Sequence, residues 1–179
     1  MERKKILKYR NEIFIYIMFS VGIAGHLSNS FFDLMLLLTP FTLLVMGLFV
    51  LYFSYKEGNK SLLIWCSVTY AITFFLEAAG VATGLVFGDY IYGHVLGLKV
   101  FDVLLIIGFN WVIVILGAIK ITELLKIKNL YSYLVTPLLA VLFDIILEPV
   151  AISLNYWQWD NIAVPLQNYF AWFIISLIA

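Results

Sequence analysis

Residues 134–154 read LVTPLLAVLFDIILEPVAISL. The run is long and apolar enough to cross a bilayer as a helix, since about 20 such residues span the ~30 Å hydrocarbon core. Yet it carries two carboxylic acids, Asp144 and Glu148, and a proline directly after the second. A charged acid near the bilayer centre costs about 2.5 to 3.5 kcal/mol. We therefore expect a transmembrane helix that turns these acids toward protein or water and away from lipid.

The rest of the chain has the same membrane character, because 64% of its 179 residues are hydrophobic and only 12% are charged. A last apolar run, LQNYFAWFIISLIA, is 14 residues long, about 21 Å as a helix, so either this helix is short or the natural chain runs further. We expect an all-α, polytopic transmembrane helical bundle in a single domain over residues 1–179, with a sixth, possibly truncated helix. The five full spans are predicted at Ile13–Ser28, Leu34–Tyr55, Leu62–Gly84, Val100–Leu125 and Leu130–Leu154.

The basic residues orient the predicted bundle. Ten of the eleven Lys and Arg residues lie on one side of the topology, in the N-terminal tail, the second loop and the region after the fourth span, and Lys99 is the exception. The positive-inside rule assigns that side to the cytoplasm. We expect an integral protein of the cell membrane with a cytoplasmic N-terminus and with segments 85–99 and 155–165 facing outward.

Four polar residues lie at similar predicted depths. Counted from the span centres, Asp144 and Asn110 fall about 3 Å outward of the bilayer midplane, Glu77 about 6 Å and Glu148 about 9 Å. Asp144 and Glu148 are four residues apart and so share one helix face. Like charges this close ionise together only at high cost in a low dielectric, so we expect at least one to hold a proton near neutral pH. The sequence thus predicts a cluster of acids in the outer half of the membrane.

Two features beside these acids predict an unusual helix environment. Pro149 removes a helix hydrogen bond, so we expect a kink next to Glu148, and irregular backbone at this depth is tolerated where it is buried or lines a cavity. The alternative is a hinge whose acids pair with polar neighbours. Gly80 and Gly84, just beyond Glu77, have the spacing that lets helices pack closely, although such pairs commonly serve packing alone.

Aromatic residues gather in the outward segments. Segment 85–99 contains FGDYIYG and is too short and too polar to cross the membrane, so we expect an outward loop or a re-entrant lid. Tyrosine and tryptophan at this level also form ordinary interfacial belts. As walls of an outer vestibule they would suit flat conjugated chains and developing positive charge, which each ring attracts by about 0.5 to 2 kcal/mol. The vestibule residues are Tyr90, Tyr92, Trp111, Tyr156, Trp157 and Trp159.

Several chemistries are disfavoured by what the sequence lacks. Its two histidines, His26 and His94, are too few for the His-rich ligand sets of membrane desaturases, hydroxylases and oxygenases. It contains no phosphate-binding glycine loop, dinucleotide fingerprint, serine elbow or zinc motif. We therefore expect no metal site. Acid catalysis by carboxyl groups in an apolar, aromatic cavity remains.

Six short motifs carry a family resemblance between about residues 60 and 172. They are EAAGVATG (77–84), FGDYIYG (87–93), FNW (109–111), DIILEPVA (144–151), YWQW (156–159) and PLQN (165–168). In combination they resemble the integral-membrane carotenoid biosynthesis proteins, which include the carotenoid C-1,2 hydratases acting on γ-carotene and on bisanhydrobacterioruberin.

The resemblance implies a cofactor-independent hydro-lyase. Such an enzyme protonates C2 of the terminal C1–C2 double bond of a linear (ψ) carotenoid end group, which leaves a tertiary cation at C1, and adds water to that cation. Asp144 or Glu148 would deliver the proton, Glu77 would position or deprotonate the water, and Asn110 would orient one of them. The partners are a lipophilic carotenoid and membrane lipid, and no nucleic acid is implied. The expected substrate-binding residues are Tyr90, Tyr92, Trp111, Trp157, Gly80 and Gly84, with Asp89, Asn168 and Trp172 as secondary candidates.

Two other functions are compatible with the same residues. Intramembrane acids beside a broken helix also occur in proton-coupled carriers. Against a carrier, the predicted spans contain no duplicated half and no second proline-broken helix that carries acids. A non-catalytic carotenoid- or lipid-binding membrane protein, in which the acids are structural, is the third possibility.

Overall fold

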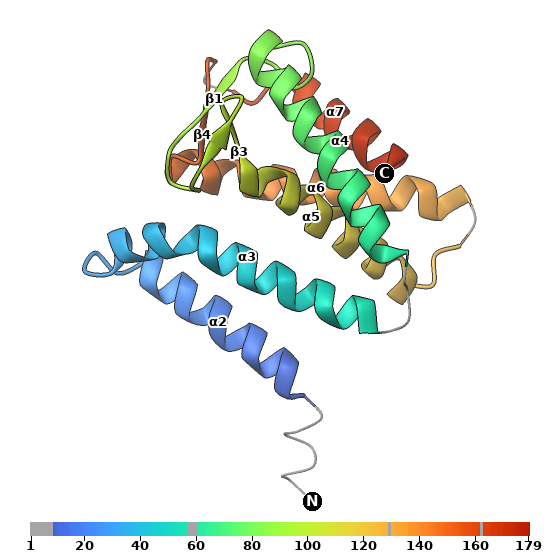
Figure 1. The fold of residues 1–179 in the computed structure, drawn as a ribbon, viewed down its shortest axis with the longest axis horizontal. Helices are drawn as coiled ribbons and strands as arrows, with labels where there is room; N and C mark the ends of the chain where they lie inside the picture. The colour runs from blue at the N-terminus through green and yellow to red at the C-terminus, as the bar shows by residue number, and fades with distance from the viewer. Residues whose placement is uncertain (1–8, 57–60, 129, 162) are drawn as a thin grey trace, which may run out of the picture.

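The computed structural model describes residues 9–56, 61–128, 130–161 and 163–179, and within these ranges it is a bundle of six α-helices (Figure 1). The predicted all-α membrane bundle is therefore confirmed. The helices are α2 (Arg10–His26), α3 (Phe32–Lys56), α4 (Leu62–Thr83), α5 (Leu105–Leu124), α6 (Leu130–Ser153) and α7 (Leu166–Ile178).

Four of these helices, α3 to α6, are long and apolar enough to cross a membrane within the described residues. The prediction of five full spans is one too many for these residues. Helix α2 has 17 residues, which rise only about 25 Å, and its first turn contains Glu12. Helix α7 is a shorter apolar helix, as expected from the run after Pro165.

The helices form two parts of different character (Figure 1). Helices α2 and α3 form an antiparallel hairpin that packs on the rest mainly through α3 and α5. Helix α2 has no buried residue and α3 buries only Met46 and Gly47. Helix α5 is the centre of the other part, because it contacts α3, α4 and α6 and has buried residues along most of its length, from Ile106 to Thr122. The core of the protein therefore lies among α4, α5, α6 and α7.

Two small antiparallel sheets occupy one end of this core, although the sequence predicted no strands and, at residues 85–99, an outward loop or a re-entrant lid. Strand β1 (Tyr90–Tyr92) pairs with β4 (Trp157–Trp159), which follows α6. Strand β2 (Lys99–Val100) pairs with β3 (Val103–Leu104) across a two-residue turn in which both residues have positive φ, the geometry that gives a tight hairpin. The predicted fourth span at Val100–Leu125 is therefore wrong at its start, because residues 99–104 are used by this hairpin and α5 begins at Leu105.

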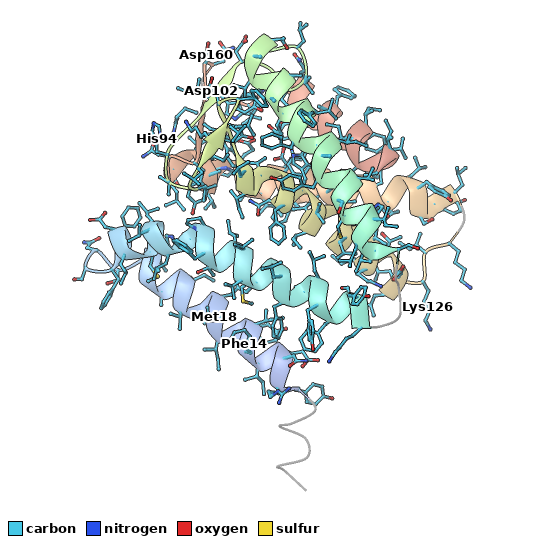
Figure 2. All side chains as sticks on the ribbon, in the orientation of Figure 1. Phe14, Met18, His94, Asp102, Lys126 and Asp160 are labelled. Atoms are coloured by element: carbon cyan, nitrogen blue, oxygen red, sulfur yellow. The ribbon has the colours of Figure 1, made fainter. Side chains whose placement is uncertain are left out.

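The two ends of the bundle differ in charge. His94, Asp102 and Asp160 lie around the sheets, whereas Lys126 lies at the far end of α5 (Figure 2). Helix α6 continues as one helix through Pro137 and Pro149 to Ser153. The acids on α6 are therefore presented by a continuous helix, and the kink predicted at Pro149 stays a prediction.

Candidate functional site

The β1–β4 ribbon presents four aromatic side chains to the helices. In the register, Tyr90 lies opposite Trp159 and Tyr92 opposite Trp157. Alternate residues of a strand point to the same face, so all four aromatic residues share one side of the ribbon. Tyr90 and Tyr92 are buried, whereas Ile91 between them is 63% exposed. The aromatic face therefore covers the ends of α4 and α6.

Glu77 on α4 accepts hydrogen bonds from three aromatic donors. The Tyr90 hydroxyl and the Tyr92 hydroxyl, the latter at 2.7 Å, both donate to Oε2, and the Trp111 indole Nε1 donates to Oε1 at 2.8 Å. Glu77 is 5% exposed. Both carboxylate oxygens are thus satisfied by neutral donors, two from the ribbon and one from α5, an arrangement that stabilises a buried negative charge.

The two tyrosines remain donors over a wide pH range. Burial, reinforced by the neighbouring Glu77 carboxylate, raises the pKa of Tyr90 and of Tyr92 above the usual tyrosine range. Desolvation disfavours the phenolate, and a nearby negative charge disfavours it further. Their hydroxyl protons are therefore held for the hydrogen bonds to Glu77.

Glu148 on α6 is bound by the other strand of the same ribbon. The indole Nε1 atoms of Trp157 and Trp159 both donate to its Oε2, at 3.0 and 2.9 Å. Glu148 is 3% exposed. Because Tyr90 and Trp159 also contact each other, with ring centroids 4.9 Å apart, the ribbon joins the Glu77 and Glu148 side chains through one aromatic layer.

Asp144 is the most deeply buried of the three acids, at 1% exposure, and it has the fewest donors. Among the described residues its carboxylate accepts one hydrogen bond, from Asn168 Nδ2 on α7 to Oδ2 at 2.7 Å. One turn further along α7, Trp172 stacks on Trp111 with ring centroids 3.7 Å apart and an interplanar angle of 20°. Helix α7 therefore closes the side of the cluster that the ribbon leaves open.

The three acids form one group that lacks a basic partner. Asp144 lies within electrostatic range of both Glu148 and Glu77. In the part of the chain that the structure describes, no Lys or Arg is paired with any of them, since the ion pair found there is Lys120–Glu123 near the opposite end of α5. In the same ranges no three His, Cys, Asp or Glu side chains are grouped as metal ligands would be. The carboxyl groups are thus surrounded by neutral donors and aromatic rings.

Other predicted site residues lie outside this hydrogen-bonded cluster. Asn110 is half-buried, and in the described residues no hydrogen bond connects it to an acid. Asp89 is exposed, and its backbone carbonyl accepts the Asp160 N–H at 3.0 Å.

Gly80 and Gly84 lie against the segment that follows α4. A Cβ on Gly80 would lie 2.7 Å from the Phe87 ring. Gly84 ends α4 with φ +68°, and a Cβ there would meet the Asp89 carboxylate. The glycine pair thus makes room for a loop and not for a neighbouring helix.

The cluster is packed and lies away from the two pockets described in the structure. These pockets, of about 320 and 300 Å³, are lined by residues of α3, α4 and α5, together with Ser61 just before α4. Neither is lined by Glu77, Asp144 or Glu148. The water-accessible space expected around the acids is therefore not one of these pockets, and a ligand that reaches the acids must displace part of their aromatic cover.

One site residue, Trp159, was grouped with the vestibule from the sequence but was not among the predicted binding residues. Its indole binds Glu148 as closely as that of Trp157 does. The signal was available: Tyr-Ile-Tyr and Trp-Gln-Trp are two short alternating patterns, each able to present its first and third residues on one face. What the sequence did not reveal was that these patterns pair across 64 intervening residues.

The three acids and their hydrogen-bond donors lie in the part of the chain that matches a known protein family. The sequence model of a family described as carotenoid biosynthesis protein matches residues 34–179. No curated protein and no solved structure matches the chain. The family match begins within α3, so it contains every acid, donor and aromatic residue of the cluster and leaves α2 outside.

Proposed function

Because the chain belongs to the carotenoid biosynthesis protein family, we propose that it is a carotenoid hydratase that adds water across the terminal C1–C2 double bond of a linear (ψ) end group by acid catalysis. Such a substrate is a long hydrocarbon that dissolves in the bilayer, and four helices of the chain are suited to span one. The proposed reaction is a hydro-lyase step that needs no cofactor.

The observation that supports this chemistry best is the cluster of three buried acids, which has no basic partner among the residues that the structure describes. Adding a proton to the alkene creates a tertiary carbocation, and a cation is stabilised by nearby carboxylates and by the faces of aromatic rings. A Lys or Arg in the cluster would oppose this step. Neutral donors from Tyr, Trp and Asn side chains instead keep the acids in place without cancelling their charge.

Asp144 is the best candidate for the proton donor. It has one neutral donor and the deepest burial, whereas Glu77 has three donors and Glu148 has two. Burial without charge-stabilising partners favours the protonated form of a carboxylic acid. In the proposed step, the Asp144 proton forms a bond to C2, the alkene π electrons supply that bond, and Asp144 becomes a carboxylate.

Glu77 then serves as the base. Its three donors stabilise the ionised form more than the single donor of Asp144 does, so Glu77 is the better group to accept a proton from water as the water oxygen bonds to C1. The net change is the addition of one water, and a proton returns from Glu77 to Asp144 through solvent before the next cycle. Glu148, between the ribbon and Asp144, would contribute negative charge near the cation and does not need to exchange a proton.

The proposed placement in the membrane follows the charges at the two ends of the bundle. Basic residues near Lys56 and Lys126 mark the cytoplasmic side, so the N-terminus is cytoplasmic and the sheets face outward. The acids then lie in the outer half of a cell membrane. Residues 85–99, which include β1, form the lid whose movement admits the end of the carotenoid and water, because the β1–β4 ribbon covers both Glu77 and Glu148.

The proposal is tested by expressing the chain in a host that makes lycopene or γ-carotene and analysing the pigments by chromatography and mass spectrometry. Wild-type protein is expected to yield a product heavier by one water, and Asp144→Asn and Glu77→Gln should accumulate in the membrane without making it. Asp33→Asn is the matched control, since Asp33 is an exposed acid outside the cluster. Full product yield from both cluster variants would refute the acid–base assignment.

Pigment analysis, together with a transport assay, separates the alternatives. Unchanged pigment that copurifies with the wild-type protein would instead indicate a carotenoid-binding protein. Proton-dependent uptake of a solute into liposomes that contain the purified chain, without any hydrated pigment, would indicate a carrier.

A further inference from the structure

We infer that a groove along α3, α4 and α5 holds the polyene stem of the carotenoid while its end group reaches the acids. This inference rests on the proposed function for the identity of the end group, but the binding of the stem is tested separately from turnover.

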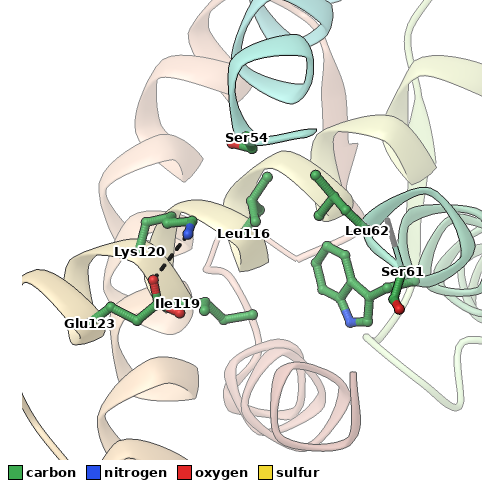
Figure 3. Close-up of a pocket in the computed structure, with 8 residues that line it drawn as sticks. Ser54, Ser61, Leu62, Leu116, Ile119, Lys120 and Glu123 are labelled. Atoms are coloured by element: carbon green, nitrogen blue, oxygen red, sulfur yellow. Dashed lines mark hydrogen bonds and ion pairs between the residues drawn. The ribbon is translucent and has the colours of Figure 1, made fainter. Parts of the chain in front are cut away.

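Two neighbouring pockets make up the groove. The first, of about 320 Å³, lies where the end of α3 meets the start of α4 and the last turns of α5, and Figure 3 shows Ser54 facing Leu62 and Leu116 across it. The second, of about 300 Å³, is lined by the same three helices one turn nearer the acids, with Leu51, Cys66 and Val112 among its residues. On each helix the residues of the two pockets follow one another: Ser54 and Leu51 on α3, Trp65 and Cys66 on α4, Leu116 and Val112 on α5.

The groove follows the helices over a length that suits a rod-like chain. Along α5 it extends from Glu123 to Phe109, a helical distance of about 21 Å. Its upper residue on α4, Tyr70, lies seven residues before Glu77, about a further 10 Å along that helix. The distance from Glu123 at the lower end of the groove to the level of Glu77 is thus about 30 Å, comparable with the hydrocarbon thickness of a bilayer, which suits an extended polyene better than a compact ligand.

The upper end of the groove is connected to the acid cluster through both helices. On α4, Tyr70 is stacked on Phe74, with an interplanar angle of 5°, and Phe74 precedes Glu77 by three residues on the same face. On α5, Val112 lines the groove and the preceding residue, Trp111, donates to Glu77. A chain lying in the groove therefore points its end at the aromatic layer around Glu77.

The composition of the groove changes along its length in the way that a carotenoid requires. From its middle to its upper end the groove is mainly apolar and aromatic, with Trp65, Tyr70 and Phe109 offering flat surfaces to a conjugated chain. The lower end carries Ser54 and the Lys120–Glu123 ion pair, whose Nζ–Oε2 distance is 3.0 Å (Figure 3). A polar far end of the substrate, such as one that already carries a hydroxyl, would therefore also be accommodated.

Cys66 allows a direct test, because it is the chain's one cysteine and it lines the second pocket. Purified protein in lipid nanodiscs is treated with N-ethylmaleimide, with and without lycopene, and labelling is followed by intact-protein mass spectrometry. At lycopene concentrations ten times its Kd, the labelling rate should fall about tenfold. Asp144→Asn should show the same protection, because it removes the proposed proton donor and leaves the groove intact.

Squalane, a flexible saturated hydrocarbon without conjugated double bonds, should protect Cys66 much less than lycopene does. Equal protection by squalane, or no protection by lycopene, would overturn the inference. If the pigment is hydrated but Cys66 is not protected, the proposed function stands and the groove is rejected. If Cys66 is protected but no pigment is hydrated, the groove stands and the proposed function is rejected.

A pair of adjacent substitutions provides the second test. Ser67 lines the second pocket at its exposed edge, and Val68 is exposed on the same turn without lining either pocket. Ser67→Trp should fill the groove and reduce the lycopene that copurifies with the protein, whereas Val68→Trp should retain the wild-type amount. Equal retention by the two variants would contradict a polyene site in this groove.

Discussion

The α2–α3 hairpin and the body formed by α4 to α7 are both apolar, but only the body buries acidic side chains. Helix α3 is the most hydropathic of the four candidate spans, yet it buries only Met46 and Gly47. Helices α4 and α6 are less hydropathic and bury Glu77, Asp144 and Glu148. Hydropathy thus identifies which helices enter the membrane, and the buried acids identify which of them are packed into a specific site.

The difference has an energetic origin. In lipid, apolar helices gain little from burying apolar surface against one another, so their association depends on close packing and on polar contacts. Each hydrogen bond between the ribbon and an acid satisfies a group that would otherwise be costly in hydrocarbon. The body is therefore expected to be sensitive to single substitutions, and the hairpin tolerant of them.

The largest effect is expected for Asp144, the proposed proton donor. Asp144→Asn keeps the size of the side chain and its contact with Asn168 but cannot supply the proton, so product formation should fall by about 100-fold or more. The measurement is hydrated pigment per amount of membrane-inserted protein in the carotenoid-producing host. Asp144→Glu, which retains a carboxylic acid, should recover part of the activity, and an equal loss in both variants would argue for a purely structural Asp144.

A large loss of stability is expected for Trp111→Phe. The change removes the indole donor to Glu77 Oε1 and weakens the stack on Trp172. An unsatisfied buried acceptor costs about 1 to 3 kcal/mol, and an aromatic pair contributes about 0.5 to 1.5 kcal/mol. The midpoint of SDS-induced unfolding should therefore decrease clearly. Phe49→Leu in α3 is the comparison, and an equal decrease there would abolish the distinction between hairpin and body.

A pH-dependent effect is expected from the ribbon tyrosines. The pKa values of Tyr90 and Tyr92 are raised in the folded protein, so above pH ~10 the unfolded chain releases protons that the folded chain keeps. The free energy of unfolding should then fall as the pH rises past 10, by up to about 1.4 kcal/mol per tyrosine for each pH unit. Unfolding midpoints measured at pH 9 and pH 11 should converge in the Tyr90→Phe/Tyr92→Phe variant. An unchanged pH dependence in that variant would show that other groups are responsible.

A smaller effect is expected for each indole donor to Glu148. Trp159→Phe and Trp157→Phe each remove one of two hydrogen bonds to the same oxygen, so each should destabilise the protein by about 1 kcal/mol. The double variant should lose more than the sum, because Glu148 is then left without a donor in the described structure. Strict additivity in the unfolding measurements would mean that the two indoles act independently.

The smallest effect is expected in the hairpin. His26 donates through Nδ1 to the Gly22 carbonyl at 2.8 Å within its own helix and lies near Thr39 of α3 at 3.4 Å. Helix α2 has no buried residue and lies outside the family match. His26→Ala should therefore change the free energy of unfolding by less than about 1 kcal/mol and leave product formation unchanged. A loss of product would bring α2 into the functional unit.

The sequence by itself determined the class of fold and the acids that the proposed chemistry uses. Apolar runs of spanning length predict membrane helices because length and hydropathy are local properties of the chain. Glu77, Asp144 and Glu148 were identifiable because a buried acid in such a run is too costly to be incidental. Within the described residues four helices, and not five, have spanning length, and the predicted start of the fourth span was wrong, since the limits of α2 and the β2–β3 hairpin depend on contacts and turn geometry as well as on hydropathy.

Only the tertiary structure decided how these residues meet. The pairing of Tyr90 with Trp159 and of Tyr92 with Trp157 connects segments far apart in the chain, and it determines which donors each acid receives. The stacking of Trp172 on Trp111 and the contact of Asn168 with Asp144 depend on where α7 packs. A periodic pattern specifies which face of a segment is inward, but the partner of that face is chosen by the packing of the whole chain.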